Sequence, residues 1–259
     1  MHPHATIRDV LDAFRIGDIS LEEAEDAISG MRLDQVGDLA HLDLGRGIRC
    51  GMPEVILAEG KDVVDVTRIA LQMVRSSGRA IVSRVDDEHV HALASLASKE
   101  AIRVEHNERA RMVILSDGTP VQTHRGVVGI LSAGTADIRV AEEARVIAGE
   151  MGCRVLTAYD VGVAGIHRLF SALKGMSGAH VYVVAAGREG TLPSLVAGLV
   201  DRPVIGVPVS TGYGHQGKGE AALASMLQSC SVLTVVNIDA GIIAGAFAAR
   251  IAKMVAGHE

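Results

Sequence analysis

The stretch Val181-Tyr-Val-Val-Ala-Ala-Gly-Arg-Glu-Gly-Thr-Leu-Pro193 decides the fold of the C-terminal half of this chain. It begins with a continuous apolar run, which is typical of a strand in a parallel sheet with helices over both faces. The glycines Gly187 and Gly190 then indicate a loop, and Pro193 suits the first turn of a helix. The stretch therefore predicts a strand, a glycine-rich loop and a helix, in that order.

Four more apolar runs repeat this pattern, and a helical run follows each strand. We expect strands at 127–131, 154–158, 180–185, 203–207 and 232–238. Five such units predict an α/β fold with a doubly wound, five-stranded parallel sheet. The turn-rich Ser116-Asp-Gly-Thr-Pro120 marks a boundary, so we divide the chain into domains 1–119 and 120–259.

The N-terminal domain is expected to be a smaller α/β unit. A capping box of Ser20 and Glu23 predicts a helix over 19–31. Residues 43–54 are rich in glycine and arginine and show neither helical nor strand periodicity, which indicates an ordered loop or arm. We further expect strands at 54–58 and 80–85, helices at 62–76 and 87–99, and one or two strands within 102–115.

Composition excludes several classes of function. The 259 residues carry a formal charge of −6, with three Tyr, three Phe and no Trp, which leaves no basic or aromatic surface for nucleic acid. Charges interrupt residues 1–20, so no signal peptide is expected, and Asn237 and Asp239 make 231–249 too polar for a membrane span. The three cysteines lack the spacing of a zinc site. We expect a cytoplasmic protein with a small-molecule partner.

Three loops after the expected strands can bind a phosphorylated ligand, because backbone amides, a helix N-terminus and hydroxyls favour an anion. The candidate ligands are Ser132, Gly134, Thr135, Asp137, Gly187, Arg188 and Ser210. Each loop also has a plain structural explanation: a tight turn at 132–137, a surface ion pair of Arg188 with Glu189, and a flexible link at 208–220. Convergence of the first two at one sheet edge favours a binding site.

Cys230 lies between a helix and the expected strand 232–238. Cysteines in such places are mostly small buried hydrophobic residues, and the end of a helix does not favour a thiolate. The residues alone therefore do not select Cys230 as a nucleophile.

These motifs together resemble the aminoimidazole ribonucleotide carboxylase superfamily, whose pattern is matched by Gly129-Ile-Leu-Ser-Ala-Gly-Thr-Ala-Asp137, Ala185-Ala-Gly-Arg-Glu-Gly-Thr-Leu-Pro193 and Pro203-Val-Ile-Gly-Val-Pro-Val209. Within it the chain is most similar to the LarB family. That resemblance is carried by residues 43–54, Glu59-Gly-Lys61, Tyr159-Asp-Val-Gly-Val-Ala-Gly-Ile-His-Arg168, Met226-Leu-Gln-Ser-Cys230 and Val235-Val-Asn-Ile-Asp239.

The resemblance implies a PurE-like fold and a carboxylase and hydrolase that acts on nicotinic acid adenine dinucleotide. It implies carbon dioxide or bicarbonate as co-substrate, Mg²⁺ near Asp137 and Asp160, and a homo-oligomer, by family an octamer. It also makes Cys230 the nucleophile that attacks the pyridinium ring, and Glu189 or His167 is then our candidate base. Two alternatives stay open: a purine-pathway aminoimidazole ribonucleotide carboxylase and a non-catalytic nucleotide-binding protein.

The position of Cys230 predicts an active site shared between subunits. The loops at Gly134 and Gly187 follow their strands and lie at the carboxyl edge of the sheet, whereas Cys230 precedes its strand and lies near the opposite edge. A six-residue strand spans roughly 20 Å, which is too far for one ring and its adjacent phosphate to bridge. We therefore expect Cys230 of one subunit to meet the phosphate loops of another.

Overall fold

The computed structural model describes residues 7–212 and 214–257 of the chain. It divides into two compact units, one made of Met1–Asn107 with Met112–Thr119 and the other of Glu108–Arg111 with Pro120–Glu259. Each unit has its own sheet and hydrophobic core. Within the described residues, no helix has the length and apolar character needed to cross a membrane.

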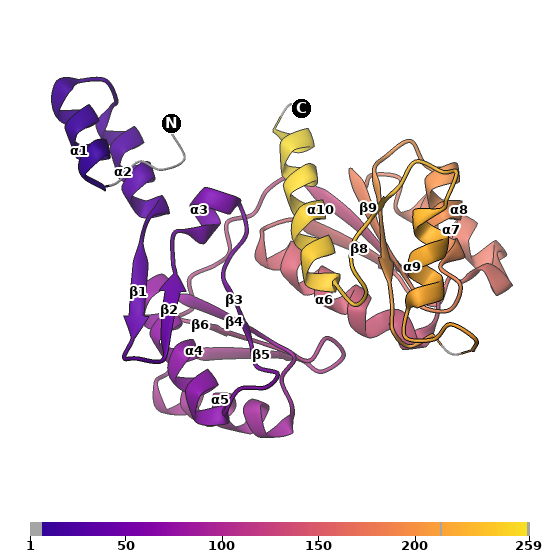
Figure 1. Cartoon of the computed structure of the whole chain (residues 1–259), viewed down its shortest axis with the longest axis horizontal. Coiled ribbons are helices and arrows are strands. Elements are labelled where there is room, and N and C mark those ends of the chain that lie inside the picture. The colour runs from indigo at the N-terminus through magenta and orange to yellow at the C-terminus, as the bar shows by residue number, and fades with distance from the viewer. Residues whose placement is uncertain (1–6, 213, 258–259) are drawn as a thin grey trace. The chain divides into compact units, whose positions relative to one another are not determined.

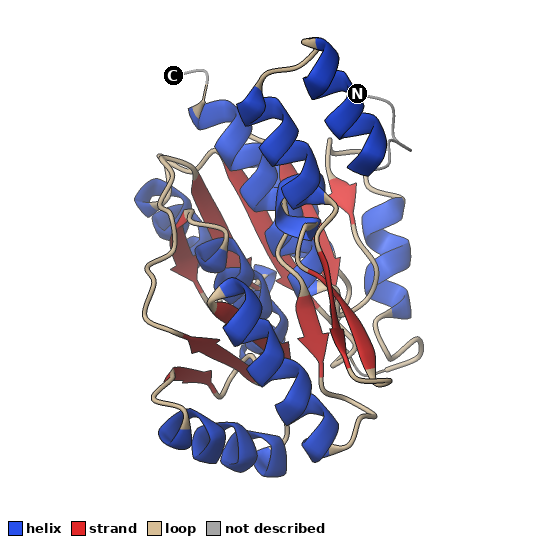
Figure 2. Cartoon of the chain, turned by 90° about the vertical axis from the view of Figure 1, so that its left-hand side faces the viewer, coloured by secondary structure: helices blue, strands red, loops and turns tan. Residues whose placement is uncertain are grey.

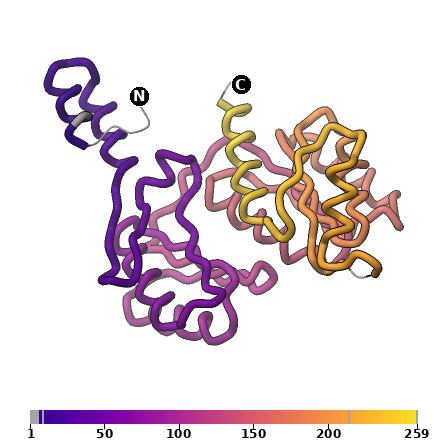
Figure 3. The backbone as a smooth tube through the Cα atoms, viewed as in Figure 1, coloured from indigo at the N-terminus to yellow at the C-terminus, as the bar shows by residue number. Residues whose placement is uncertain are grey.

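The first unit begins with two helices, α1 (Ile7–Ile16) and α2 (Leu21–Gly30). The tube in Figure 3 shows the chain turning back on itself between them. The predicted capping box of α2 is confirmed, because Glu23 N donates to Ser20 Oγ (3.2 Å) and Ser20 N donates to Glu23 Oε2 (2.7 Å). Helix α1 was not expected from the sequence.

An antiparallel hairpin of β1 (Leu33–Val36) and β2 (Ala40–Asp43) leads to a short helix, α3 (Arg46–Cys50). The expectation of a loop over all of 43–54 is therefore wrong. Helix α3 has no apolar periodicity, and contacts of Arg49 with residues outside the helix hold it in place. Arg49 Nη1 donates to Gly30 O (2.6 Å), and Arg49 Nη2 pairs with Asp43 Oδ2 (2.5 Å). The helix ends at Gly51, whose φ of 68° suits glycine.

The sheet of the first unit contains β3 (Val55–Leu57), β4 (Arg79–Ser83), β5 (Arg103–Asn107) and β6 (Met112–Ser116), in the order β3-β4-β6-β5. Strand β3 is parallel to β4, and the other pairs are antiparallel. Helices α4 (Val63–Ser77) and α5 (Asp87–Lys99) pack on it through a core that includes Val66, Leu93 and Leu115. The strands and helices expected between 54 and 115 are thus present.

The second unit is built on five parallel strands: β7 (Val127–Ser132), β8 (Arg154–Ala158), β9 (Val181–Ala186), β10 (Val204–Pro208) and β11 (Thr234–Val235). Their order is β11-β10-β9-β7-β8, which confirms the predicted doubly wound parallel sheet. Figure 1 labels two of these strands, β8 and β9. After β8 the chain returns past β7 to form β9, so the winding reverses between β7 and β9. Ligands bind at the carboxyl edge of a sheet at such a reversal.

Helices cover both faces of this sheet. Figure 2 distinguishes the helices of the chain from its strands by colour. On one face α6 (Ile138–Glu150) packs against α10 (Gly241–Ala256); on the other lie α7 (His167–Gly175), α8 (Thr191–Leu199) and α9 (Glu220–Leu227). Gly245 permits the close approach of α10 to α6, because an added Cβ would lie 2.4 Å from Ala144 O. The residues of β9 and β10 are all buried, as their apolar runs predicted, whereas β8, at an edge of the sheet, is partly exposed.

Strand β11 is much shorter than the expected run of 232–238. Only Thr234 and Val235 join the ladder, with Thr234 opposite Ile205 of β10. Val232 is 92% exposed, and β11 is an edge strand with a neighbour on one side only. The apolar segment 232–238 therefore predicted too long a strand, because the residues of a segment at the edge of a sheet need not all be paired or buried.

A partly buried phenol and a buried carboxylate connect the residue after β8 to α6. Tyr159 donates its hydroxyl proton to Glu142, and burial, followed by the effect of Glu142, raises the pKa of Tyr159. We expect Tyr159→Phe to lower the free energy of unfolding of the second unit by about 1.5–3 kcal/mol, because a charged buried acceptor loses one of its donors and keeps Arg145 Nε (2.8 Å). Tyr182→Phe is the control: its hydroxyl donates to the neutral Met176 O (2.8 Å), so its loss should be nearer 1 kcal/mol. Urea unfolding that gives equal losses would contradict this ranking.

Candidate active site

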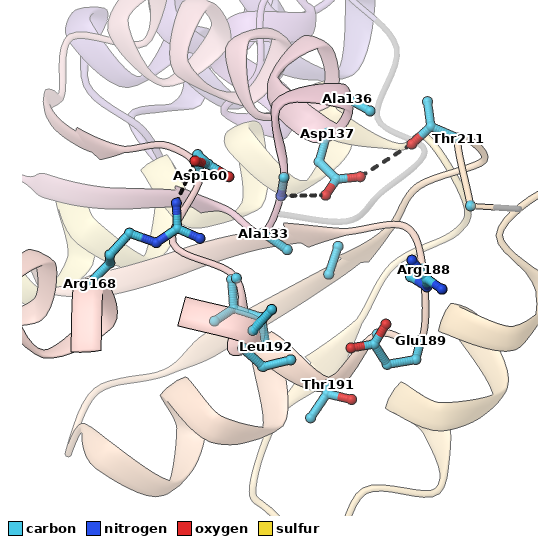
Figure 4. Close-up of a pocket in the computed structure, with 17 residues that line it drawn as sticks. Ala133, Ala136, Asp137, Asp160, Arg168, Arg188, Glu189, Thr191, Leu192 and Thr211 are labelled. Atoms are coloured by element: carbon cyan, nitrogen blue, oxygen red, sulfur yellow. Dashed lines mark hydrogen bonds and ion pairs between the residues drawn. The ribbon is translucent and has the colours of Figure 1, made fainter. Parts of the chain in front are cut away.

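A cavity of about 290 Å³ lies at the carboxyl edge of the parallel sheet, where the winding reverses (Figure 4). The loops after β7, β8, β9 and β10 all contribute to it. Its polar lining comes from Asp137, Asp160, Arg168, Arg188, Glu189, Thr191 and Thr211, with glycine backbone at Gly134, Gly162, Gly190 and Gly212. The structure thus brings together the three loops that were selected from the sequence and joins them to the loop after β8.

Asp137 ties three of these loops together. It ends the short 3-10 helix Thr135–Asp137 and is 6% exposed. Its Oδ2 accepts from Gly134 N (2.9 Å), its Oδ1 accepts from Thr211 Oγ1 (3.2 Å), and the Gly187 amide also donates to it. Burial raises the pKa of Asp137, and these hydrogen bonds oppose the rise. The carboxylate is therefore an internal brace for the loops that surround the cavity.

A second carboxylate braces the loop after β10. Asp239, which has a φ of 55°, accepts from Ser210 N (3.0 Å) and from Ser210 Oγ (2.5 Å). Arg139 Nη2 lies 3.5 Å from Asp239 Oδ2, and its Nη1 lies 3.6 Å from Glu143 Oε1. Ser210 is therefore held by Asp239, and its neighbour Thr211 is the residue that lines the cavity.

One wall of the cavity consists of an ion pair after β8. Arg168 Nη1 lies 2.5 Å from Asp160 Oδ2, and the two side chains are 41% and 49% exposed. Asp160 has a φ of 57°, and its amide donates to Ser132 Oγ (3.2 Å). Ser132 is fully buried behind this wall, so its hydroxyl positions the turn of Asp160.

Arg188 and Glu189 lie on the other side of the cavity, in the loop before α8 (Figure 4). Both side chains belong to exposed residues. The loop passes closely beneath the β10 loop, since a Cβ on Gly212 would lie 2.0 Å from Gly187 O. The carboxylate of Glu189 is thus part of the wall of the cavity that Gly134 also lines.

The remaining candidates lie elsewhere. Thr135 is exposed next to the cavity loop, and His167 is exposed at the first residue of α7, beside the cavity residue Arg168. Cys230 is an exposed free thiol that follows α9 and precedes β11. It therefore lies toward the amino edge of the sheet, and the five-residue ladder of β10 separates the two edges by roughly 16 Å.

The expected magnesium ligands, Asp137 and Asp160, do not form a ready site for the ion. Both oxygens of Asp137 already accept hydrogen bonds from the loops, and Asp160 is paired with Arg168. Among the described residues, no three His, Cys, Asp or Glu side chains are grouped so that they could hold a metal. Mg²⁺ prefers near-octahedral oxygen coordination, which this donor set does not offer.

Sequence reasoning missed Arg168 and Thr211 as cavity residues. Both lie beside residues that were selected, His167 and Ser210. The ends of the predicted strands correctly indicated which loops form the cavity. Which of two neighbouring side chains in a loop faces the cavity depends on the turn that the loop makes. The charge of Arg168, three residues after Gly165 and six after Gly162, was the available signal.

Comparison with known proteins agrees with this architecture. Residues 33–117 match the LarB/PurE-like N-terminal domain, and residues 127–258 match AIR carboxylase. An uncharacterized protein of Methanocaldococcus jannaschii is 43% identical over 254 residues, which cover 96% of this chain and 97% of that protein. The same organism's N5-carboxyaminoimidazole ribonucleotide mutase is 33% identical over 120 residues, or 44% of this chain and 71% of the relative.

A probable N5-carboxyaminoimidazole ribonucleotide mutase of Methanothermobacter thermautotrophicus is 32% identical over 130 residues, and the match spans only 37% of that relative. These relatives suggest carboxylase or mutase chemistry for the second unit. The first unit matches a domain that is named for LarB. The chain thus has a LarB-type N-terminal domain followed by a PurE-like domain, whose cavity lies where the winding of the sheet reverses. It belongs to the LarB family of the PurE-like superfamily.

Proposed function

We propose that this protein converts nicotinic acid adenine dinucleotide, carbon dioxide or bicarbonate, and water into pyridinium-3,5-biscarboxylic acid mononucleotide and AMP, a reaction of nickel-pincer cofactor biosynthesis. The observation that carries the proposal is the pairing of a LarB-type domain with a PurE-like domain in one chain. The cavity supports it, because glycine backbone and two arginines converge where a phosphorylated ligand would bind.

The reaction needs a nucleophile because a pyridinium ring is electron-poor and does not attack carbon dioxide. In our proposal the Cys230 thiolate adds to the ring carbon para to the nitrogen, and the ring becomes a neutral dihydropyridine. The carbon beside the new C–S bond is then enamine-like and forms a bond to carbon dioxide. A base removes the proton from that carbon, and the electron pair expels the thiolate and restores the aromatic ring. Water separately cleaves the phosphoanhydride and releases AMP.

Two subunits supply the groups for this sequence in our proposal. One chain encloses about 290 Å³, at the lower end of the roughly 300–1,000 Å³ of small-molecule sites, so a whole dinucleotide would extend beyond it. Cys230 is exposed at the other edge of the sheet and is available to a neighbouring copy. In a homo-oligomer, the Cys230 edge of one subunit can face the cavity edge of another. Cys230 then reaches the pyridinium ring while the phosphates of the dinucleotide stay in the cavity.

The nearest alternative is a purine-pathway carboxylase or mutase, which the ribonucleotide mutase relatives of the second unit favour. Its substrate already carries a nucleophilic carbon, so Cys230 would have no role. The two are separated by incubating the protein with each substrate and bicarbonate and following product by liquid chromatography. We expect turnover of the pyridinium dinucleotide alone. Turnover of the aminoimidazole ribonucleotide alone would establish the alternative, and binding without turnover of either would indicate a non-catalytic protein.

Glu189 is the stronger candidate for the base, because it lines the cavity whereas His167 lies on the exposed start of α7. We expect Glu189→Gln to lower kcat about a hundredfold or more while dinucleotide binding is kept, since the amide preserves shape and cannot take a proton. His167→Gln should have a smaller effect. Glu105→Gln, on an exposed strand of the first unit, is the neutral control. Steady-state kinetics in which His167→Gln is the more damaging change would move the role to His167.

A further inference from the structure

Arg168 projects into the cavity for reasons that lie in its own local structure. It comes from the first turn of α7 and folds back over the short 3-10 helix Val163–Gly165. A Cβ on Gly165 would lie only 2.6 Å from Arg168 Nε and 2.9 Å from its Nη2, so the glycine is what lets the guanidinium take this position. Figure 4 shows it on the side of the cavity opposite Arg188.

The ion pair of Arg168 with Asp160 is suited to exchange its anion for a ligand. Both side chains are partly exposed, at 41% and 49%, and exposed pairs of this kind contribute little to stability. Only Nη1 of the guanidinium contacts Asp160 at 2.5 Å, and a guanidinium has further donors in a planar fork that matches a phosphate. The backbone of Ala133 and Gly134 lines the same cavity.

We propose that Arg168 binds a phosphate of the substrate, and that Asp160 is its counter-ion before the ligand arrives, which the phosphate displaces from the guanidinium. The proposal rests on the proposed function, because it assumes a phosphorylated dinucleotide in this cavity. It replaces the expectation that Asp160 is a metal ligand. Arg168 thereby becomes a determinant of affinity for the nucleotide, distinct from the base Glu189 and the nucleophile Cys230.

The two roles for Asp160 predict opposite signs in a binding experiment. If Asp160 is a counter-ion, Asp160→Asn leaves Arg168 without a competing carboxylate, so a phosphate ligand should bind at least as tightly as to the wild type. If Asp160 is a metal ligand, the same change should remove any gain in affinity that magnesium gives. Asparagine also tolerates the φ of 57° at this position, so the backbone is kept.

The test is isothermal titration calorimetry with the full chain, using nicotinic acid adenine dinucleotide, AMP and nicotinic acid mononucleotide, each with and without magnesium and at two salt concentrations. Arg168→Gln should raise the Kd for the dinucleotide by about tenfold to a hundredfold and weaken its salt dependence. Arg168→Lys should recover part of the loss, because it keeps the charge without the fork. The matched control is Arg202→Gln, since Arg202 is 44% exposed and also pairs with an aspartate, Asp201.

The mononucleotide arms identify which half of the dinucleotide has its phosphate at Arg168, because only that half should lose affinity in Arg168→Gln. An unchanged Kd in Arg168→Gln for ligands that the wild type binds would overturn the role of Arg168 and leave the proposed function intact. A loss of the magnesium effect in Asp160→Asn would overturn the role of Asp160. A wild type that binds none of the three ligands would overturn the proposed function and this inference together.

Discussion

Cys230→Ser is expected to lower carboxylation by at least about a thousandfold, because the hydroxyl is far less ionised than a thiol and a poorer partner for reversible addition to a soft ring carbon. Binding of the dinucleotide should be kept, since the cavity is lined by residues of other loops. The measurement is incorporation of labelled bicarbonate into the nucleotide under saturating substrate. It should be accompanied by titration of the ligand, so that binding and chemistry are separated.

Cys50→Ser is the matched control for this change, because Cys50 is also an exposed free thiol and lies in the first unit. It should leave carboxylation near the wild-type rate. Cys153→Ser should also be milder than Cys230→Ser, although burial raises the pKa of Cys153 and its side chain donates to Ala249 O (3.7 Å), so some stability can be lost. Wild-type carboxylation by Cys230→Ser would eliminate covalent catalysis by this residue.

Mixed oligomers of two inactive variants should regain activity. Cys230→Ser lacks the nucleophile, and Gly134→Asp places a negative charge in the phosphate loop. A Cβ at Gly134 lies 3.6 Å from Asp137 Oδ2, an ordinary contact, so the fold should tolerate the change. If each site takes Cys230 from one subunit and its loops from another, random mixing in equal amounts should restore about a quarter of the sites.

Each variant that is dissociated and reassembled alone is the control and should stay inactive. Subunit exchange is verified by native mass spectrometry of chains with different tags. If exchange is complete and the mixture is as inactive as its components, the shared site is wrong. Cys230 would then have to reach a ring bound within its own chain. The length of β10 separates Cys230, at one edge of the sheet, from the cavity at the other edge.

The parallel sheet was predictable because its strands are covered on both faces. Residues 181–186 are all buried, and so are 204–208, so β9 and β10 appear in the sequence as unbroken apolar runs. Strand β8, at an edge of the sheet, is partly exposed and contains Arg154 and Thr157. The edge strand β11 is paired on one side only, and its apolar residues include the exposed Val232. Its length was therefore the least predictable feature of the sheet.

In the first unit, helices α1 and α3 were missed, for different reasons. Helix α3 is held by Arg49 through Gly30 and Asp43, which no local pattern records. Helix α1 is different, because Ile7, Val10, Leu11 and Phe14 do have helical spacing. This helix was therefore predictable from local spacing alone.

The candidate site divides in the same way. The loops that follow the predicted strands lie at the carboxyl edge of the sheet, as expected. Their residues Gly134, Asp137, Arg188 and Glu189 line the cavity. Ser132 and Ser210 instead bond to neighbouring loops. Whether a hydroxyl faces the ligand or braces the loop depends on partners such as Asp239, which are distant in sequence.

One measurement tests the central proposal most directly. Purified protein is incubated with nicotinic acid adenine dinucleotide, carbon-13 bicarbonate and magnesium, and the products are identified by mass spectrometry. We predict equal amounts of AMP and of a dicarboxylated pyridinium mononucleotide that carries one carbon-13 atom, both absent when the dinucleotide is omitted. Active, correctly folded protein that forms neither product, or that releases AMP with no labelled carboxylate on the ring, would contradict the account.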